Sequence, residues 1–161
     1  MGDGHDLTVK ESGDHEIHAE RFLAAPRERV WKAFTDPDLI PQWWGLRSTT
    51  TIVDKMEVRP GGAWRFVQRD EDGSEMGFRG EFRAINEPES LTWTFEWEGL
   101  PGHISVETVT FTEKDGGTLV STVTVFDTKD DRDGMLSSGM EDGMRETYDR
   151  LAELLASDEA A

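Results

Sequence analysis

The stretch Leu91-Thr92-Trp93-Thr94-Phe95-Glu96-Trp97-Glu98 alternates between large apolar and polar residues at every position. Successive side chains of a β-strand point to opposite faces, so the leucine and the three aromatic residues share one face. The other face carries only threonine and glutamate. The stretch therefore predicts a strand that places a row of rings against the interior of the protein.

The same two-residue period extends over much of the chain on both sides of this stretch. Short turns with glycine or proline, such as Pro60-Gly61-Gly62 and Leu100-Pro101-Gly102, separate most neighbouring segments. Consecutive strands joined by short turns pair in an antiparallel manner. The pattern predicts seven antiparallel strands, at residues 16–23, 50–58, 63–69, 75–85, 90–97, 104–112 and 118–127.

Helical patterns flank these strands. Pro26 marks the start of a short helix after the first strand, and a second short helix is expected to end at Gly45. Near the C-terminus an apolar stripe with spacings of 4, 4, 3 and 4 predicts a long helix, and residues 132–138 form an extra turn or a bent start before it. The stripe consists of Met140, Met144, Tyr148, Leu151 and Leu155. A curved seven-stranded antiparallel sheet around a long C-terminal helix, with two short helices after the first strand, is an α+β fold.

The composition limits the classes of protein to which this chain can belong. Its 161 residues fit one domain, expected at 15–156 between a disordered leader at 1–14 and a frayed tail at 157–161. The absence of cysteine excludes disulfides and thiolate metal sites. The net charge of −17 argues against binding to nucleic acids or anionic membranes. No apolar run approaches the ~20 residues of a membrane span, and a cytoplasmic location is expected.

Large rings gather on one face of the predicted sheet, opposite methionines of the C-terminal helix. One interpretation is a packed aromatic core. The other is an apolar cavity, because Gly139 and Gly143 bend the helix or leave space beneath it, and methionines adapt to varied ligand shapes. The cavity interpretation predicts a ligand site formed by Trp43, Trp44, Trp64, Phe66, Phe78, Trp93, Phe95, Trp97, Met140 and Met144, with His103 at its mouth.

Several motifs in combination resemble a known family. They are residues 25–37, Trp43-Trp44-Gly45, and residues 59–66, 101–111 and 139–144. Together they are similar to the START-like (SRPBCC) superfamily, in the branch that resembles the C-terminal domain of the activator of the 90-kDa heat-shock-protein ATPase. The resemblance covers about residues 15–156. It implies a helix-grip fold (START-like or Bet v 1-like), in which the sheet wraps around the long helix with a cavity between them.

The ring pattern and the resemblance together predict a protein that binds an apolar or aromatic small molecule, such as a lipid, flavonoid or polyketide. No cofactor, metal or catalytic residue is assigned. One alternative is a cyclase- or hydrolase-type enzyme that uses a polar group such as His103 or Asp54. Asp54 is in phase with Ile52 and Met56, so a regular strand would direct its carboxylate into the cavity, whereas a bulge would turn it to solvent. Another alternative is a module that binds a chaperone, and a homodimer is also left open.

Overall fold

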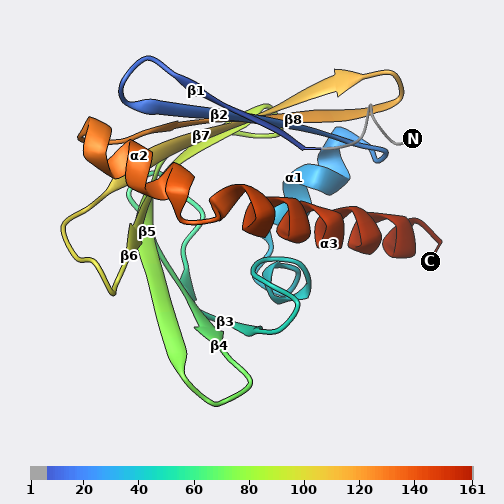
Figure 1. Cartoon of the computed structure of the whole chain (residues 1–161). Coiled ribbons are helices and arrows are strands. Elements are labelled where there is room, and N and C mark those ends of the chain that lie inside the picture. Colours follow the sequence, from blue (N-terminus) through green and yellow to red (C-terminus); the bar gives the residue numbers. More distant parts are fainter. Residues whose placement is uncertain (1–6, 161) are drawn as a thin grey trace.

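The computed structural model describes residues 7–160, with side chains through residue 157. Eight antiparallel strands form one sheet in the order β1-β2-β8-β7-β6-β5-β4-β3. The sheet curves around the long helix α3, which lies across its concave side (Figure 1). The elements are β1 (Thr8–Ser12), β2 (Glu16–Leu23), α1 (Arg27–Thr35), the 3-10 helix η2 (Ile40–Gln42), β3 (Thr50–Met56), β4 (Ala63–Arg69), β5 (Glu75–Asn86), β6 (Ser90–Trp97), β7 (Ser105–Lys114), β8 (Gly117–Val125), α2 (Lys129–Ser137) and α3 (Met140–Ala160).

This architecture confirms the α+β helix-grip fold, with one more strand than expected. Seven strands begin and end within two residues of the segments predicted from the two-residue period. The eighth, β1, pairs with β2 inside the segment that was expected to be a disordered leader. Leu7 is buried and Val9 packs against the core, so this segment is ordered by apolar burial as well as by strand pairing. The leader prediction is therefore wrong for residues 8–12, while residues 1–6 lie outside the described part of the chain.

The helices depart from the prediction in three places. The second short helix is a single 3-10 turn, and Gly45 follows it closely with φ +98°. Residues 129–137 form a complete helix, α2, whose N-terminus is capped by the Thr128 side chain. Gly139 has φ +86°, a left-handed conformation that glycine adopts readily, and it separates α2 from α3. Helix α3 continues to Ala160 and so includes most of the segment predicted to be frayed.

An aromatic cluster separates the middle of the sheet from the helices. It comprises Trp31 and Phe34 of α1, Trp43 after η2, Phe111 of β7 and Tyr148 of α3. Phe34 lies at its centre, with ring centroids 5.1 Å from Phe111 and 4.8 Å from Trp43. Trp43 stacks on Tyr148 at 6.4 Å. All five rings are buried, so this part of the concave side is filled with side chains.

No helix within the described residues is both long enough and apolar enough to cross a membrane.

A buried arginine attaches the β1–β2 hairpin to α2. Arg132 is 1% exposed, and its Nη1 donates to the backbone oxygens of Gly13 and Glu16 at 3.0 and 3.1 Å. Its Nε donates to Asp133 at 2.8 Å. Because the guanidinium is buried, its removal takes away both the packing of the side chain and a charged donor to the hairpin carbonyls.

Replacing this arginine should destabilise the protein strongly. We expect Arg132→Met to lower the free energy of unfolding by roughly 2–4 kcal/mol, measured by urea denaturation, since the hairpin carbonyls lose their charged donor. Arg83→Met is the matched control, because Arg83 is an exposed residue whose Nε lies 3.3 Å from Glu81. That variant should stay within about 0.5 kcal/mol of the wild type. Equal losses in the two variants would contradict the role given to Arg132.

Candidate functional site

Rings of three neighbouring strands and one loop form a continuous wall on the concave side of the sheet. Trp64 of β4 lies 5.5 Å from Trp93 and 6.1 Å from Phe95, both on β6 (centroid distances). Phe95 stacks on Phe78 of β5 at 5.5 Å. Trp44 meets Phe78 edge-on at 5.6 Å and Trp64 at 6.4 Å. These five residues are called the ring wall below.

The opposite side of the site is the N-terminal part of α3. Farther along this helix, Tyr148, Leu151 and Leu155 are buried in the core. Met140 and Met144 are only partly buried, although they belong to the same apolar stripe. Helix α3 therefore packs tightly along its C-terminal part and incompletely along its N-terminal part.

The loop between η2 and β3 forms the third side and is bound to α3. Arg150 Nη1 donates to the Gly45 carbonyl at 2.8 Å, and the Thr147 hydroxyl donates to the same oxygen at 3.3 Å. Gly45 has φ +98°, and a Cβ there would lie 2.2 Å from the Gln68 side chain. Only glycine fits both the backbone conformation and this close approach. The Trp43-Trp44-Gly45 motif thus places one tryptophan in the core and the next in the ring wall.

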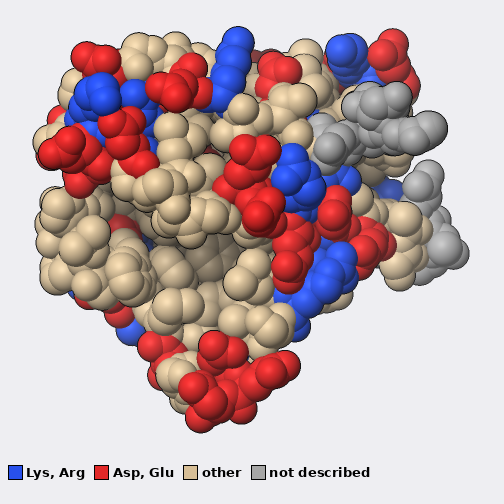
Figure 2. All heavy atoms as spheres, viewed as in Figure 1, with Lys and Arg blue, Asp and Glu red and all other residues tan. Residues whose placement is uncertain are grey.

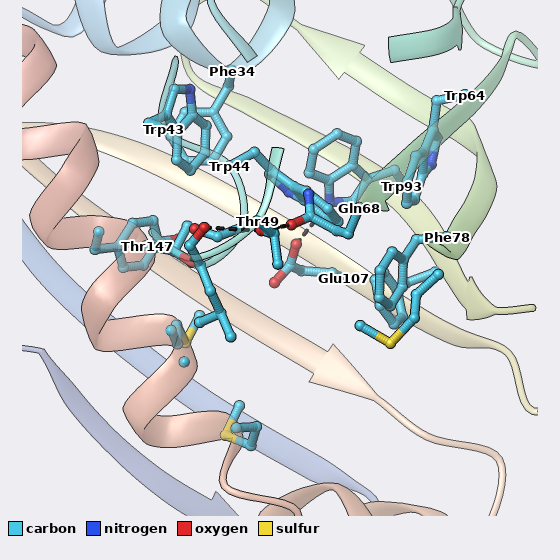
Figure 3. Close-up of a pocket in the computed structure, with 18 residues that line it drawn as sticks. Phe34, Trp43, Trp44, Thr49, Trp64, Gln68, Phe78, Trp93, Glu107 and Thr147 are labelled. Atoms are coloured by element: carbon cyan, nitrogen blue, oxygen red, sulfur yellow. Dashed lines mark hydrogen bonds between the residues drawn. The ribbon is translucent and has the colours of Figure 1, made fainter. Parts of the chain in front are cut away.

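These three sides enclose a cavity of about 410 Å³, within the size range of small-molecule sites in proteins. It appears as a hollow among uncharged residues near the centre of the molecular face in Figure 2, and Figure 3 shows its lining side chains. The lining consists of Phe34, Trp43, Trp44, Gly45, Leu46, Thr49, Trp64, Gln68, Met76, Phe78, Trp93, Phe95, Glu107, Met140, Gly143, Met144, Thr147 and Tyr148.

Most polar groups around the cavity are satisfied within the protein. The indole nitrogens of Trp43 and Trp64 donate to the carbonyls of Ala33 and Thr94 at 2.9 and 3.0 Å. Gln68 hydrogen-bonds with the hydroxyls of Thr49 and Thr51. These groups orient the lining side chains and leave the cavity with a predominantly apolar surface.

Glu107 of β7, which was not predicted as a site residue, brings a carboxyl group into this lining. Its Oε1 accepts a hydrogen bond from Trp93 Nε1 at 2.7 Å, and the Thr124 hydroxyl of β8 also hydrogen-bonds with the carboxylate. Burial raises the pKa of Glu107, and the two hydrogen bonds oppose part of this rise. The pKa of the Tyr148 phenol is likewise raised, by burial and by the nearby Glu107 carboxylate. A signal was present in the sequence, because Glu107 is in phase with Val109 and Phe111 on the inward face.

Eight of the ten aromatic and methionine residues predicted to form the site do line the cavity. The other two are Phe66, which is completely buried behind Trp44 at 5.0 Å, and Trp97. Trp97 is 41% exposed at the end of β6, where its ring lies against Gly99 beyond the ring wall. The predicted alternation along β6 is therefore correct, but the strand continues beyond the cavity, so Trp97 does not line it.

The two polar candidates, Asp54 and His103, lie outside the cavity. A bulge in β3 between Val53 and Lys55 turns Asp54 to the outer surface, where its carboxylate lies 3.5 Å from Arg65. The prediction of Asp54 as a polar cavity residue is therefore wrong. His103 is exposed in the β6–β7 loop, and its Nδ1 lies 2.8 Å from Asp131 of α2. It does not line the cavity.

Within the described part of the chain, no group of three or more histidine, aspartate or glutamate side chains converges in a way that could hold a metal ion.

A curved antiparallel sheet that wraps a long C-terminal helix and encloses an apolar cavity defines a START-like domain of the helix-grip type. The model of the family described as "Activator of Hsp90 ATPase homolog 1-like protein" (AHSA1) matches residues 24–156. The chain belongs to this family, as the motif resemblance implied.

Solved structures support the same assignment of fold. A Rhodobacter sphaeroides protein is similar, with a TM-score of 0.89 and 25% identity, over 94% of this chain and 99% of that one. A Mycobacterium smegmatis protein has a TM-score of 0.83 and 27% identity, over 92% and 96%. The AHSA1 protein of Silicibacter pomeroyi has a TM-score of 0.74 and 21% identity, over 89% and 99%. No curated protein sequence matches the chain.

The burial of Glu107 should make stability depend on pH with a defined sign. Below the pKa that Glu107 has in the unfolded chain, its carboxyl group is neutral in both the folded and the unfolded state. Its ionisation then does not lower the stability. As the pH rises, the unfolded state loses its proton first, so ionisation favours unfolding until the pH passes the raised pKa of the folded state. We expect Glu107→Gln to gain stability relative to the wild type over this range, by about 1.4 kcal/mol per unit of raised pKa. Urea denaturation at several pH values measures the difference, and a difference that is constant with pH would refute the raised pKa.

Proposed function

We propose that this protein binds an apolar or aromatic small molecule, of the lipid, flavonoid or polyketide kind, in the cavity between the ring wall and α3. The observation that carries this proposal is the cavity of about 410 Å³, which is lined mainly by aromatic rings, methionines and Leu46. Burial of apolar ligand surface contributes roughly 25 cal/mol per Å², before the cost of association is subtracted. Rings on one side favour flat ligands, while Met140 and Met144 on the other side adapt to the ligand's thickness.

Binding is a better-supported function than catalysis for this cavity. Asp54 and His103, the polar groups that the enzyme alternative named as examples, both lie outside the cavity. A chaperone as partner is suggested by the family's description, and a homodimer stays a prediction from the sequence. Neither has a structural observation in its favour comparable to the cavity. The proposal includes a cytoplasmic location.

Filling the cavity from α3 should weaken binding without unfolding the protein. Gly143 lines the cavity, and a Cβ there would meet only Leu46 Cδ2, at an ordinary 3.7 Å. We expect Gly143→Leu to weaken binding of naphthalen-2-ylmethanol, a flat neutral probe, at least about tenfold by calorimetry, because the leucine occupies the probe's space. Replacing a glycine within a helix also adds up to ~1 kcal/mol of helix propensity, so the variant should fold.

Gly134→Leu is the matched control. Gly134 lies within α2, does not line the cavity, and has nothing within 4 Å of the position of a Cβ. This variant should gain the same helix propensity and bind the probe as the wild type does. The proposal fails if neither this probe nor a panel of lipids, flavonoids and polyketides binds the wild type, or if both glycine variants bind equally well.

A further inference from the structure

Glu107 has no positively charged partner in the cavity. Its two hydrogen-bond donors, Trp93 and Thr124, are both neutral. No lysine or arginine is among the residues that line the cavity in the described part of the chain. Glu107 is partly buried, and carboxylates that lose water are normally paired with a cation or a metal. The cavity therefore combines an apolar surface with one acidic group whose opposite charge the protein does not supply.

The ring wall lies on one side of this carboxyl group and brings several aromatic rings close to it. Trp93 donates to Glu107 directly, and Trp64 follows it at a centroid distance of 5.5 Å. Figure 3 shows Glu107 in the middle of the lining, with Trp93, Trp64 and Phe78 on one side of it. The faces of aromatic rings carry partial negative charge and bind ammonium groups, most strongly at sites removed from water.

We propose that the ligand of this cavity is an apolar molecule that carries one protonated amine, which pairs with Glu107 beside the ring wall. This inference rests on the proposed function and specifies the class of ligand. The rings bind the apolar body, and the carboxylate selects the amine. The net charge of −17 adds a long-range attraction for cations and a repulsion for fatty acids and other anions.

The groups around Glu107 set the pH at which this pairing is available. Tyr148 faces it from α3 and stays neutral, because its own pKa is raised. Arg21 of β2 lies near Tyr148, and its Nη1 is already paired with Asp149 of α3 at 2.8 Å. Because burial raises the pKa of Glu107, the empty cavity holds a proton there at acidic pH, and an ammonium group must displace it. The affinity for an amine should thus rise with pH for as long as the amine remains protonated.

Two probes of the same shape test the proposal. We would measure binding of naphthalen-2-ylmethylamine and naphthalen-2-ylmethanol to the full chain by calorimetry from pH 5 to pH 8. For the wild type at the upper end of this range, the amine should bind at least about tenfold more tightly than the alcohol, the effect of a hydrogen-bonded charged pair. The ratio of the two affinities should decrease toward one as the pH falls.

Two variants test whether Glu107 causes the difference in affinity between the amine and the alcohol. In Glu107→Gln the ratio should be close to one at every pH, and its thermal unfolding shows whether the variant is folded. Glu71→Gln removes one exposed carboxylate from the β4–β5 turn that does not line the cavity, and should keep the wild-type ratio.

The outcomes separate this inference from the proposed function. If the alcohol binds the wild type as tightly as the amine, the amine inference is wrong and the cavity is a site for neutral molecules. If the alcohol binds better at low pH, Glu107 acts as a neutral hydrogen-bond donor, which also overturns the inference. If neither probe nor the wider panel binds, the proposed function fails together with it. If Glu107→Gln still binds the amine more tightly than the alcohol, as the wild type does, the rings alone bind the amine and the role of the carboxylate is refuted.

Discussion

The site depends on how far the aromatic cluster holds α3 from the sheet. Phe34 and Trp43 come from the segment between β2 and β3, and they lie between Phe111 of β7 and Tyr148 of α3. Buried rings of this size resist compression, because protein interiors are packed as densely as organic crystals. The helix therefore cannot approach the sheet any more closely along its whole length. Where the cluster ends, at the N-terminal part of α3, the remaining side chains are too few to fill the space, and Gly143 contributes none.

The same arrangement explains why an acidic group is tolerated inside the fold. A carboxylate in a filled core would be costly, whereas Glu107 lies at the edge of the cavity between two hydrogen-bond donors. Its raised pKa means that the protein is less stable with Glu107 ionised than with a neutral residue of the same shape there. A residue that reduces stability in this way is typical of binding sites, where function rather than folding explains the choice of residue.

The sequence was most informative where a local pattern determined the structure. Alternation and turn residues predicted seven strands, and the apolar stripe predicted α3, because both patterns reflect which face of an element is buried. The prediction failed where a single residue changed the pattern. The bulge at Asp54 reversed its direction, and the β1–β2 hairpin is held by Arg132, more than a hundred residues away. Glu107 was missed because its partners Trp93 and Thr124 lie on other strands, although its phase with Val109 was visible.

The distribution of roles between rings and carboxylate also bears on how relatives of this chain should be compared. Rings supply affinity to almost any apolar molecule of suitable size, so a fold shared at 21–27% identity conveys little about the ligand. Discrimination between ligands requires a polar group whose mismatch is costly, since a buried group that loses its partner has no water to replace it. In this cavity that group is at position 107 on β7. The identity of the residue facing the cavity from this strand, together with its neighbours on β6 and β8, is therefore a better guide to ligand class within this fold than the number of aromatic residues.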